Sequence, residues 1–182
     1  MRSRLLLDAP QFKVTIERLA HQVIESFDDF SQVAFIGLQP RGIYLSRRLE
    51  QRLRKIQHKT EFLFGELDVT FHRDDFRRRD EPLSPLPTNV DFGIEGKTVV
   101  LIDDVLYTGR TIRAALDALM DLGRPERVEL MVLIDRRFSR QLPIEADFIG
   151  RTIDSIDSER VDVRWEEIDD SDEVVLYKKK SG

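Results

Sequence analysis

The chain has 182 residues, no cysteine and a formal net charge of −5 at pH 7. This length fits a single domain, 1–182, that buries about 70% of the surface its unfolded chain would expose. The absence of cysteine excludes disulfides and Cys-ligated zinc, and no apolar run approaches the roughly 20 residues of a membrane span. Residues 5–7 are too short an apolar run for a signal peptide. We therefore expect a cytoplasmic protein without a membrane partner, and the acidic balance argues against a surface built entirely for nucleic acid.

Residues 10–27 are predicted to form an amphipathic helix. Pro10 suits a first helical turn after Asp8. An apolar stripe at helical spacing would face the core, and it consists of Phe12, Ile16, Leu19, Val23 and Phe27. His21 lies near the polar side of this helix, where a surface histidine is the ordinary interpretation.

Residues 33–36 form a short apolar run typical of a buried strand, and a helix is expected to follow as far as about residue 56. The loop between them, residues 37–42, begins and ends in glycine and carries Arg41. Since a guanidinium pairs well with phosphate oxygens, this loop suits an anion such as pyrophosphate. A glycine-rich turn is weak evidence by itself, and its weight comes from a second loop of similar design further along the chain.

Residues 62–69 are predicted to form another strand. The segment that follows is dense in both charges, and prolines at positions 82, 85 and 87 exclude regular structure after it. A loop of this length is commonly a lid over a ligand or a solvated segment. Arg73 and residues 77–79 either close over an anionic ligand or remain in solvent.

The most informative stretch is residues 99–111. Its first four residues are apolar, as in a strand buried on both faces, and we expect this strand to end at Asp103 and Asp104. Residues 108–111 then open a helix predicted to reach about residue 122. The backbone N–H groups of a helix N-terminus can hold a phosphate, whereas carboxylates repel phosphate and suit hydroxyls or a metal-bound face of the ligand. A phosphorylated sugar has both parts.

Residues 128–134 supply a further strand. Strands separated by helices predict an α/β fold, with a mostly parallel central sheet flanked by helices and with ligands outside the carboxyl ends of its strands. All of the candidate loops fall on that edge. Residues 161–165 and 174–177 are predicted to form a closing antiparallel hairpin.

Phe148 and Ile149 form an aromatic-aliphatic pair just before Gly150. This pair admits two interpretations. Phe148 stacks on a planar ring while nearby backbone groups read the edge of that ring, or the pair simply packs in the core.

Residues 99–111 resemble the phosphoribosyl pyrophosphate (PRPP) signature of type I phosphoribosyltransferases, in which an apolar strand is followed by Asp-Asp and then Thr-Gly-x-Thr. The sequence motif DDVLYTGRT at residues 103–111 is most similar to the PyrR family, and so are residues 39–42, 73–75 and 142–150. That family comprises uracil phosphoribosyltransferases that double as attenuators of pyrimidine operons. The similarity extends from about residue 11 to residue 175.

The resemblance implies a type I phosphoribosyltransferase fold, with a small hood formed by parts of the N-terminus and about residues 136–160. It also implies a role for each matching position. Asp103 and Asp104 match the pair that holds the ribose hydroxyls, and Mg²⁺ would bridge those hydroxyls and the pyrophosphate, so that these carboxylates meet the metal indirectly. The other matches are the pyrophosphate loop (Gln39, Pro40, Arg41 and Gly42), the lid (Arg73 and Asp74), the 5-phosphate loop (Thr108, Gly109, Arg110 and Thr111) and the base contacts (Phe148 and Ile149). Tyr107 is a further substrate-binding residue.

Asp103, Asp104, Arg41 and Arg73 are the catalytic residues implied by this match. The implied reaction converts uracil and PRPP into UMP and pyrophosphate, in a protein expected to be a homodimer or homotetramer. Two alternatives stay open: a UMP-responsive regulator that binds leader mRNA and has weak catalysis, and a hypoxanthine-guanine phosphoribosyltransferase, which shares the sugar-phosphate chemistry. The pyrophosphate loop of this fold often contains a non-proline cis peptide.

An RNA-binding face would draw on the first helix and on the segment before the hood. Its candidate contacts are His21, Arg137, Arg140 and Arg151. Glu17 and Glu145 lie in the same regions, where a carboxylate facing a phosphate backbone opposes the electrostatic attraction that dominates RNA affinity.

Overall fold

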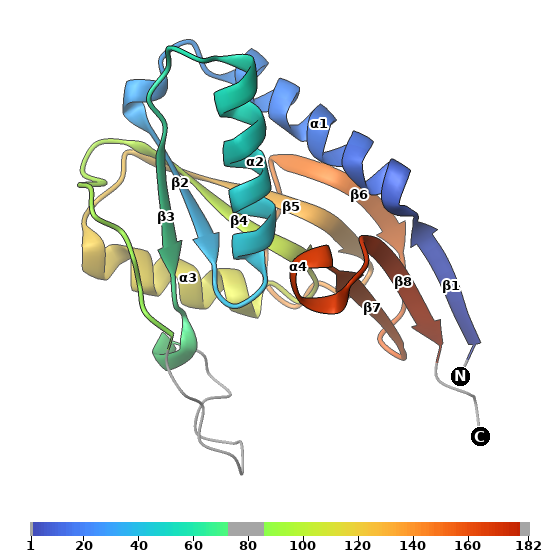
Figure 1. Ribbon diagram of the computed structural model, residues 1–182. Coiled ribbons are helices and arrows are strands. Elements are labelled where there is room, and N and C mark those ends of the chain that lie inside the picture. The colour runs from blue at the N-terminus through green and yellow to red at the C-terminus, as the bar shows by residue number, and fades with distance from the viewer. Residues whose placement is uncertain (1, 73–85, 179–182) are drawn as a thin grey trace.

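The computed structural model describes residues 2–72 and 86–178 (Figure 1). A five-stranded sheet runs through its centre in the order β3-β2-β4-β5-β6, and every neighbouring pair is parallel. The strands are β2 (Val33–Leu38), β3 (Leu63–Leu67), β4 (Thr98–Leu106), β5 (Arg127–Arg137) and β6 (Phe148–Asp154). The predicted α/β class with a mostly parallel sheet is confirmed. The predicted lid residues Arg73 and Asp74 lie outside the described residues.

Helices cover both faces of this sheet, as Figure 1 shows: α1 (Ala9–Ser26) and α2 (Gly42–Ile56) on one face, α3 (Arg110–Leu122) on the other. The core under α1 and α2 is the more aromatic of the two, with Phe12, Phe30, Phe35, Phe62, Phe148 and Trp165. The core under α3 is aliphatic. Because both faces are covered, the central strands need apolar residues in succession, and this explains the continuous run of buried residues in β2.

α1 begins and ends within one residue of the predicted helix. The Asp8 carboxylate accepts a hydrogen bond from the Gln11 backbone N–H at 2.9 Å, and the Gln11 side chain accepts one from the Asp8 N–H at 3.2 Å. This reciprocal capping box, with Pro10 in the first turn, fixes the start of the helix. The predicted apolar stripe is buried except at Phe27, which is partly exposed.

A second, smaller sheet is antiparallel and has the order β1-β8-β7. Its strands are β1 (Arg2–Leu7), β7 (Glu159–Arg164) and β8 (Glu173–Lys178), and the short helix α4 (Glu166–Asp169) joins β7 to β8. The predicted hairpin corresponds to β7 and β8. β1 was not predicted, and its pairing with β8 lays the first and last strands of the chain side by side.

Residues 148–154 form the edge strand β6 of the main sheet, and the small sheet is built from β1, β7 and β8. One boundary differs from the sequence-based expectation: β4 does not end at the paired carboxylates. Its ladder with β5 continues through Asp103 to Leu106, because the neighbouring strand extends alongside and satisfies the backbone there.

Candidate active site

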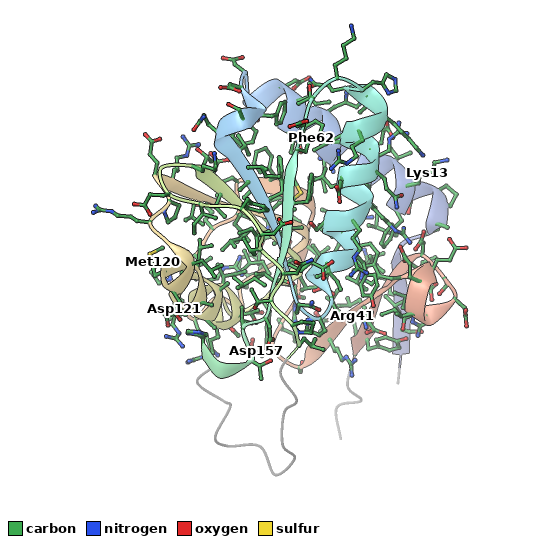
Figure 2. All side chains as sticks on the ribbon, turned by 60° about the vertical axis from the view of Figure 1, so that its left-hand side comes forward. Lys13, Arg41, Phe62, Met120, Asp121 and Asp157 are labelled. Atoms are coloured by element: carbon green, nitrogen blue, oxygen red, sulfur yellow. The ribbon has the colours of Figure 1, made fainter. Side chains whose placement is uncertain are left out.

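Two loops far apart in sequence meet at the carboxyl ends of β2 and β4. Gly42, the first residue of α2, packs directly on β4, and a Cβ atom at this position would overlap the Ile102 carbonyl oxygen and lie 2.9 Å from the Asp103 Cα. The close approach therefore requires glycine. It brings the loop that carries Arg41 against both carboxylates. Figure 2 shows Arg41 and Asp157 at the same end of the molecule, opposite Phe62.

The paired carboxylates lie in a largely desolvated position. Asp103 is 9% exposed, and its Oδ1 accepts a hydrogen bond from the Asp104 backbone N–H at 2.9 Å. The Asp104 side chain is 14% exposed, and its Oδ2 lies 3.5 Å from the Arg41 Nε. Burial raises the pKa of Asp104, although Arg41 and backbone hydrogen bonds oppose the shift. A buried carboxylate of this kind is well suited to accept hydrogen bonds from ligand hydroxyls.

The Arg41 side chain spans the gap between the two sheets. Besides Asp104, its guanidinium contacts two acceptors of the C-terminal part of the chain: Nη2 donates to the Val163 carbonyl oxygen and to the Asp169 Oδ2, the latter at 2.8 Å. Burial would raise the pKa of Asp169, but a hydrogen bond from the Trp165 N–H and the contact with Arg41 lower it overall. Asp169 was not among the residues predicted for this site.

The second loop, residues 107–111, leads into α3 as predicted. Gly109 caps the helix with φ +91°, a conformation that favours glycine, and α3 begins at Arg110. The first N–H groups of a helix have no intrahelical partner, so this turn presents donors for an anion. Thr108 and Thr111, at either side of Gly109, are both partly exposed. The geometry is that of a phosphate-sized loop.

The segment after β5 supports this loop from outside. The Thr108 carbonyl oxygen accepts hydrogen bonds from the Gln141 and Leu142 N–H groups at 3.0 and 3.2 Å, and the Arg110 Nε donates to the Gln141 side chain at 2.8 Å. Arg140 donates to the Tyr107 carbonyl oxygen through Nη1 and pairs with Asp135 through Nη2 at 2.5 Å. The loop is therefore held by side chains more than 30 residues away in sequence, a relationship that no local pattern indicates.

Tyr107 is held between a buried cation and a carboxylate. The Arg136 guanidinium lies 3.9 Å from the centre of the Tyr107 ring, and the Tyr107 hydroxyl donates to Asp157 at 3.3 Å. Arg136 is 5% exposed and donates to the Ser155 Oγ at 2.8 Å. Burial lowers the pKa of Arg136, but an arginine stays charged. Arg136 thus places a fixed positive charge beside the phosphate-sized loop.

The residues predicted to contact a base divide between the two faces of the sheet. Phe148 is 6% exposed and lies in the core under α1 and α2, with its ring 6.1 Å from that of Phe27. This placement favours core packing over base stacking for Phe148. Ile149 is partly exposed and packs against the core under α3, in register with Val132 and, one strand further, Asp103. Of the two, Ile149 lies on the same cross-strand row as Asp103.

Gln39 and Pro40 complete the first loop. The Gln39 backbone N–H donates to the Leu67 carbonyl oxygen at 2.9 Å, and its side chain donates to Glu66 at 3.2 Å, which fastens the loop to β3. Pro40 is exposed. The Gln39–Pro40 peptide is cis, so the cis bond of this loop precedes a proline and is not the non-proline cis bond that was expected.

The four candidate RNA contacts are all engaged within the chain. His21 is 55% exposed and lies 3.5 Å from Glu17, and Arg137 is 56% exposed and pairs with Asp154 at 2.6 Å. Arg151 donates to the Leu6 carbonyl oxygen, and Arg140 supports the Tyr107 loop as described above. His21 and Arg137 are thus the more exposed pair, and Arg140 has an internal role.

Comparison with known proteins places these features in context. The family model for the phosphoribosyl transferase domain matches residues 4–168. The "Bifunctional protein PyrR" of Elusimicrobium minutum is 43% identical over 98% of this chain and 98% of its own, and that of Halalkalibacterium halodurans is 44% identical over 98% and 99%. Among solved structures, a hypoxanthine phosphoribosyltransferase from Staphylococcus aureus superposes with a TM-score of 0.70 at 18% identity, over 97% of this chain and 93% of its own.

Proposed function

Because this chain belongs to the PyrR family of phosphoribosyltransferases, we propose that it transfers the phosphoribosyl group of PRPP to uracil, releasing UMP and pyrophosphate. The observation that carries the proposal is the contact between Gly42 and Asp103. It joins an arginine-bearing loop, two carboxylates and a phosphate-sized loop at one sheet edge. PRPP has a matching set of groups, with a phosphate at one end, a diphosphate at the other and ribose hydroxyls between.

The residue roles follow from the charge of each group. Residues 107–111 bind the 5-phosphate at the start of α3. Asp103 and Asp104 accept hydrogen bonds from the ribose hydroxyls. Arg41, with Gln39, Pro40 and Gly42, faces the diphosphate, where a guanidinium forms charge-assisted hydrogen bonds. Arg73 and Asp74 are proposed to close over the bound substrate, and the backbone around Ile149 to contact the base.

The donor set fits a magnesium ion held chiefly by the substrate. Among residues 2–72 and 86–178 no group of three or more His, Cys, Asp or Glu side chains could hold a metal ion. Mg²⁺ commonly takes few protein ligands and is held largely by substrate phosphates, and Asp103 and Asp104 would meet such an ion indirectly, through the ribose hydroxyls or water. When bound, the ion would neutralise negative charge on the diphosphate.

The protein's own contribution to the reaction is to position and stabilise charge. Breaking the bond at ribose C1 leaves a centre with oxocarbenium character and moves negative charge onto the leaving diphosphate. Arg41 stabilises that charge, and the loop 107–111 fixes the sugar so that uracil N1 lies in line with the breaking bond. No nucleophilic side chain is needed, because uracil is itself the nucleophile.

The decisive test compares bases. Purified protein is incubated with PRPP, Mg²⁺ and radiolabelled uracil, hypoxanthine or guanine in parallel, and nucleotide formation is measured. We expect uracil to be converted orders of magnitude faster than either purine. Faster turnover of hypoxanthine or guanine would move the assignment to a purine enzyme, which the fold alone permits.

The relatives are named bifunctional, and this supports a second activity for the chain. We propose that it binds leader mRNA of pyrimidine genes in a UMP-responsive manner, with His21 and Arg137 as the accessible contacts. A gel shift at two salt concentrations with and without UMP tests this, since contacts to phosphates weaken steeply with salt. Absence of any salt-sensitive shift would leave catalysis as the proposed function.

We further propose that the protein is cytoplasmic and forms a homodimer or homotetramer. No helix among the described residues is long and apolar enough to cross a membrane.

A further inference from the structure

We propose that Asp169 is a positioning residue for Arg41, so that a carboxylate of the C-terminal helix α4 sets the orientation of the arginine that faces the diphosphate. This inference rests on the proposed function, which gives Arg41 its ligand. It adds a residue that lies 128 positions from Arg41 in sequence, on the far side of the site.

The first step is the set of contacts around Arg41. Its Nε lies 3.5 Å from Asp104, while its Nη2 donates both to the Val163 carbonyl oxygen and to Asp169 at 2.8 Å. The Arg41 side chain is 36% exposed, so it has room to rotate if these contacts are lost. Two fixed acceptors on one nitrogen orient the guanidinium plane and so reduce the entropy that a ligand must remove.

The second step is that Asp169 is itself held in place. Its Oδ2 accepts a hydrogen bond from the Trp165 N–H at 3.0 Å, and the fully buried Trp165 packs edge-on against Phe12 at 5.0 Å. The carboxylate is therefore anchored to the main core through the residue that opens α4. An acceptor fixed in this way can orient a side chain that is otherwise free to move.

The third step is that α4 is anchored independently of Arg41. Arg48, the seventh residue of α2, pairs with Glu167 at 2.7 Å and with Asp172 at 2.7 Å, and its guanidinium lies 5.1 Å from the Trp165 ring centre. Arg48 is 19% and Asp172 18% exposed, so this pair is largely shielded from solvent, whereas Glu167 is 43% exposed. α4 can thus stay docked while Arg41 exchanges contacts with a ligand, and Asp169 then acts on Arg41 rather than on the fold.

The test uses a substitution that keeps the charge and changes the position. In Asp169→Glu the carboxylate is retained but displaced by one methylene, and we expect both kcat/KM for PRPP and affinity for Mg²⁺-diphosphate to fall about tenfold, the usual worth of one charge-assisted hydrogen bond. Asp169→Asn keeps an oxygen that can accept from Arg41 and Trp165, and should be less impaired. The matched control, Glu167→Asp, shortens a carboxylate on the same helix that pairs with Arg48 and should leave both values unchanged.

A double-mutant cycle shows whether the effect passes through Arg41. In an Arg41→Gln background, Asp169→Glu should change diphosphate affinity by less than about twofold, because the two residues would act as one unit. The positioning role would be overturned if Asp169→Glu bound diphosphate as tightly as the wild type, or if Asp169→Asn bound it more tightly. It would also be overturned if Asp169→Glu had the same effect in both backgrounds. Since calorimetry with Mg²⁺-diphosphate needs no base, this result is separate from the uracil assay: failure to form UMP overturns the proposed function, and an unchanged diphosphate affinity overturns the role of Asp169.

Discussion

Gly42 and Asp103 are in backbone contact across the gap between α2 and β4, and Gly42 has no room for an added methyl group. We predict that Gly42→Ala destabilises the protein by about 1–3 kcal/mol, the usual cost of overpacking a well-packed position. Uracil transfer should fall more than stability does, since the loop that carries Arg41 moves away from the carboxylates. Thermal unfolding and steady-state kinetics measure the two effects.

Gly93→Ala is the matched control, because a Cβ at that exposed position would have no neighbour within 4 Å. The control should keep wild-type stability and rate. Equal behaviour of the two alanine variants would show that the Gly42 contact does not organise the site.

The Arg140 side chain joins the end of β5 to the loop 107–111. We therefore predict that shortening this side chain lowers the affinity for substrate. In Arg140→Lys the bidentate contact to Asp135 and the Tyr107 carbonyl oxygen cannot be reproduced. We expect KM for PRPP to rise about tenfold, in line with the loss of a charge-assisted hydrogen bond. Arg160→Lys, at a side chain that is 79% exposed, should leave KM unchanged. Identical KM values for the two variants would remove the supporting role of Arg140.

The ionised Asp104 carboxylate should lower the free energy of unfolding at neutral pH, although the proposed reaction requires it. Burial raises the pKa of the Asp104 carboxyl above its ordinary value of 3.8, so the folded state holds the proton more tightly than the unfolded chain does. Stability is then lost as pH rises from about 3.8 through the folded pKa, and the loss is complete above it. We predict that Asp104→Asn is more stable than the wild type at pH 7, with a difference that shrinks on acidification, while uracil transfer drops by about 100-fold.

Asp29→Asn is a control for which we expect the opposite change in stability. The Ser31 backbone and hydroxyl hydrogen bonds lower the pKa of Asp29, so its carboxylate stabilises the fold above about pH 3.8 and this contribution is lost as pH falls. Asp29→Asn should therefore be less stable than the wild type at pH 7. Denaturant unfolding at several pH values tests both variants, and a stability loss for Asp104→Asn at pH 7 would contradict the prediction.

The contacts of Arg48 should make the docking of α4 sensitive to acid. The hydrogen bond from Arg48 lowers the pKa of Glu167 from 4.5; for Asp172 burial acts in the opposite direction, but Arg48 lowers its pKa from 3.8 overall. These groups stabilise the fold above their unfolded pKa values, and the stabilisation is lost as pH falls below about 4.5 through the folded values. Trp165, the only tryptophan, reports this change through its fluorescence. A Glu167→Gln/Asp172→Asn variant should lose most of the acid-induced change, and an unaltered fluorescence profile would count against the Arg48 contacts as its source.

The sequence predicted the parts of this molecule that depend on neighbours along the chain. The apolar runs of β2 and β4, the capped start of α1 and the Gly109 turn into α3 all follow from local spacing and backbone preference. The end of β4 was misplaced, because strand length depends on the partner strand and not on the first polar residue.

The supports of the site could not be predicted in this way. Arg140 contacts Tyr107 across 33 residues, and Asp169 contacts Arg41 across 128. Phe148 shows the same limit: its aromatic ring suits a base or a core equally well, and only the position of Phe27 shows which neighbour it has. Contacts of this kind are set by topology, on which local residue patterns carry no information.

The pairing of β1 with β8 also has a consequence for synthesis. β1 is made before every strand of the main sheet, but its partner β8 is made after all of them, so the small sheet and α4 assemble only after the main sheet has been synthesised. A nascent chain that already contains both ligand loops still lacks Asp169. Chains released before α4 is made would therefore present Arg41 without its α4 partner.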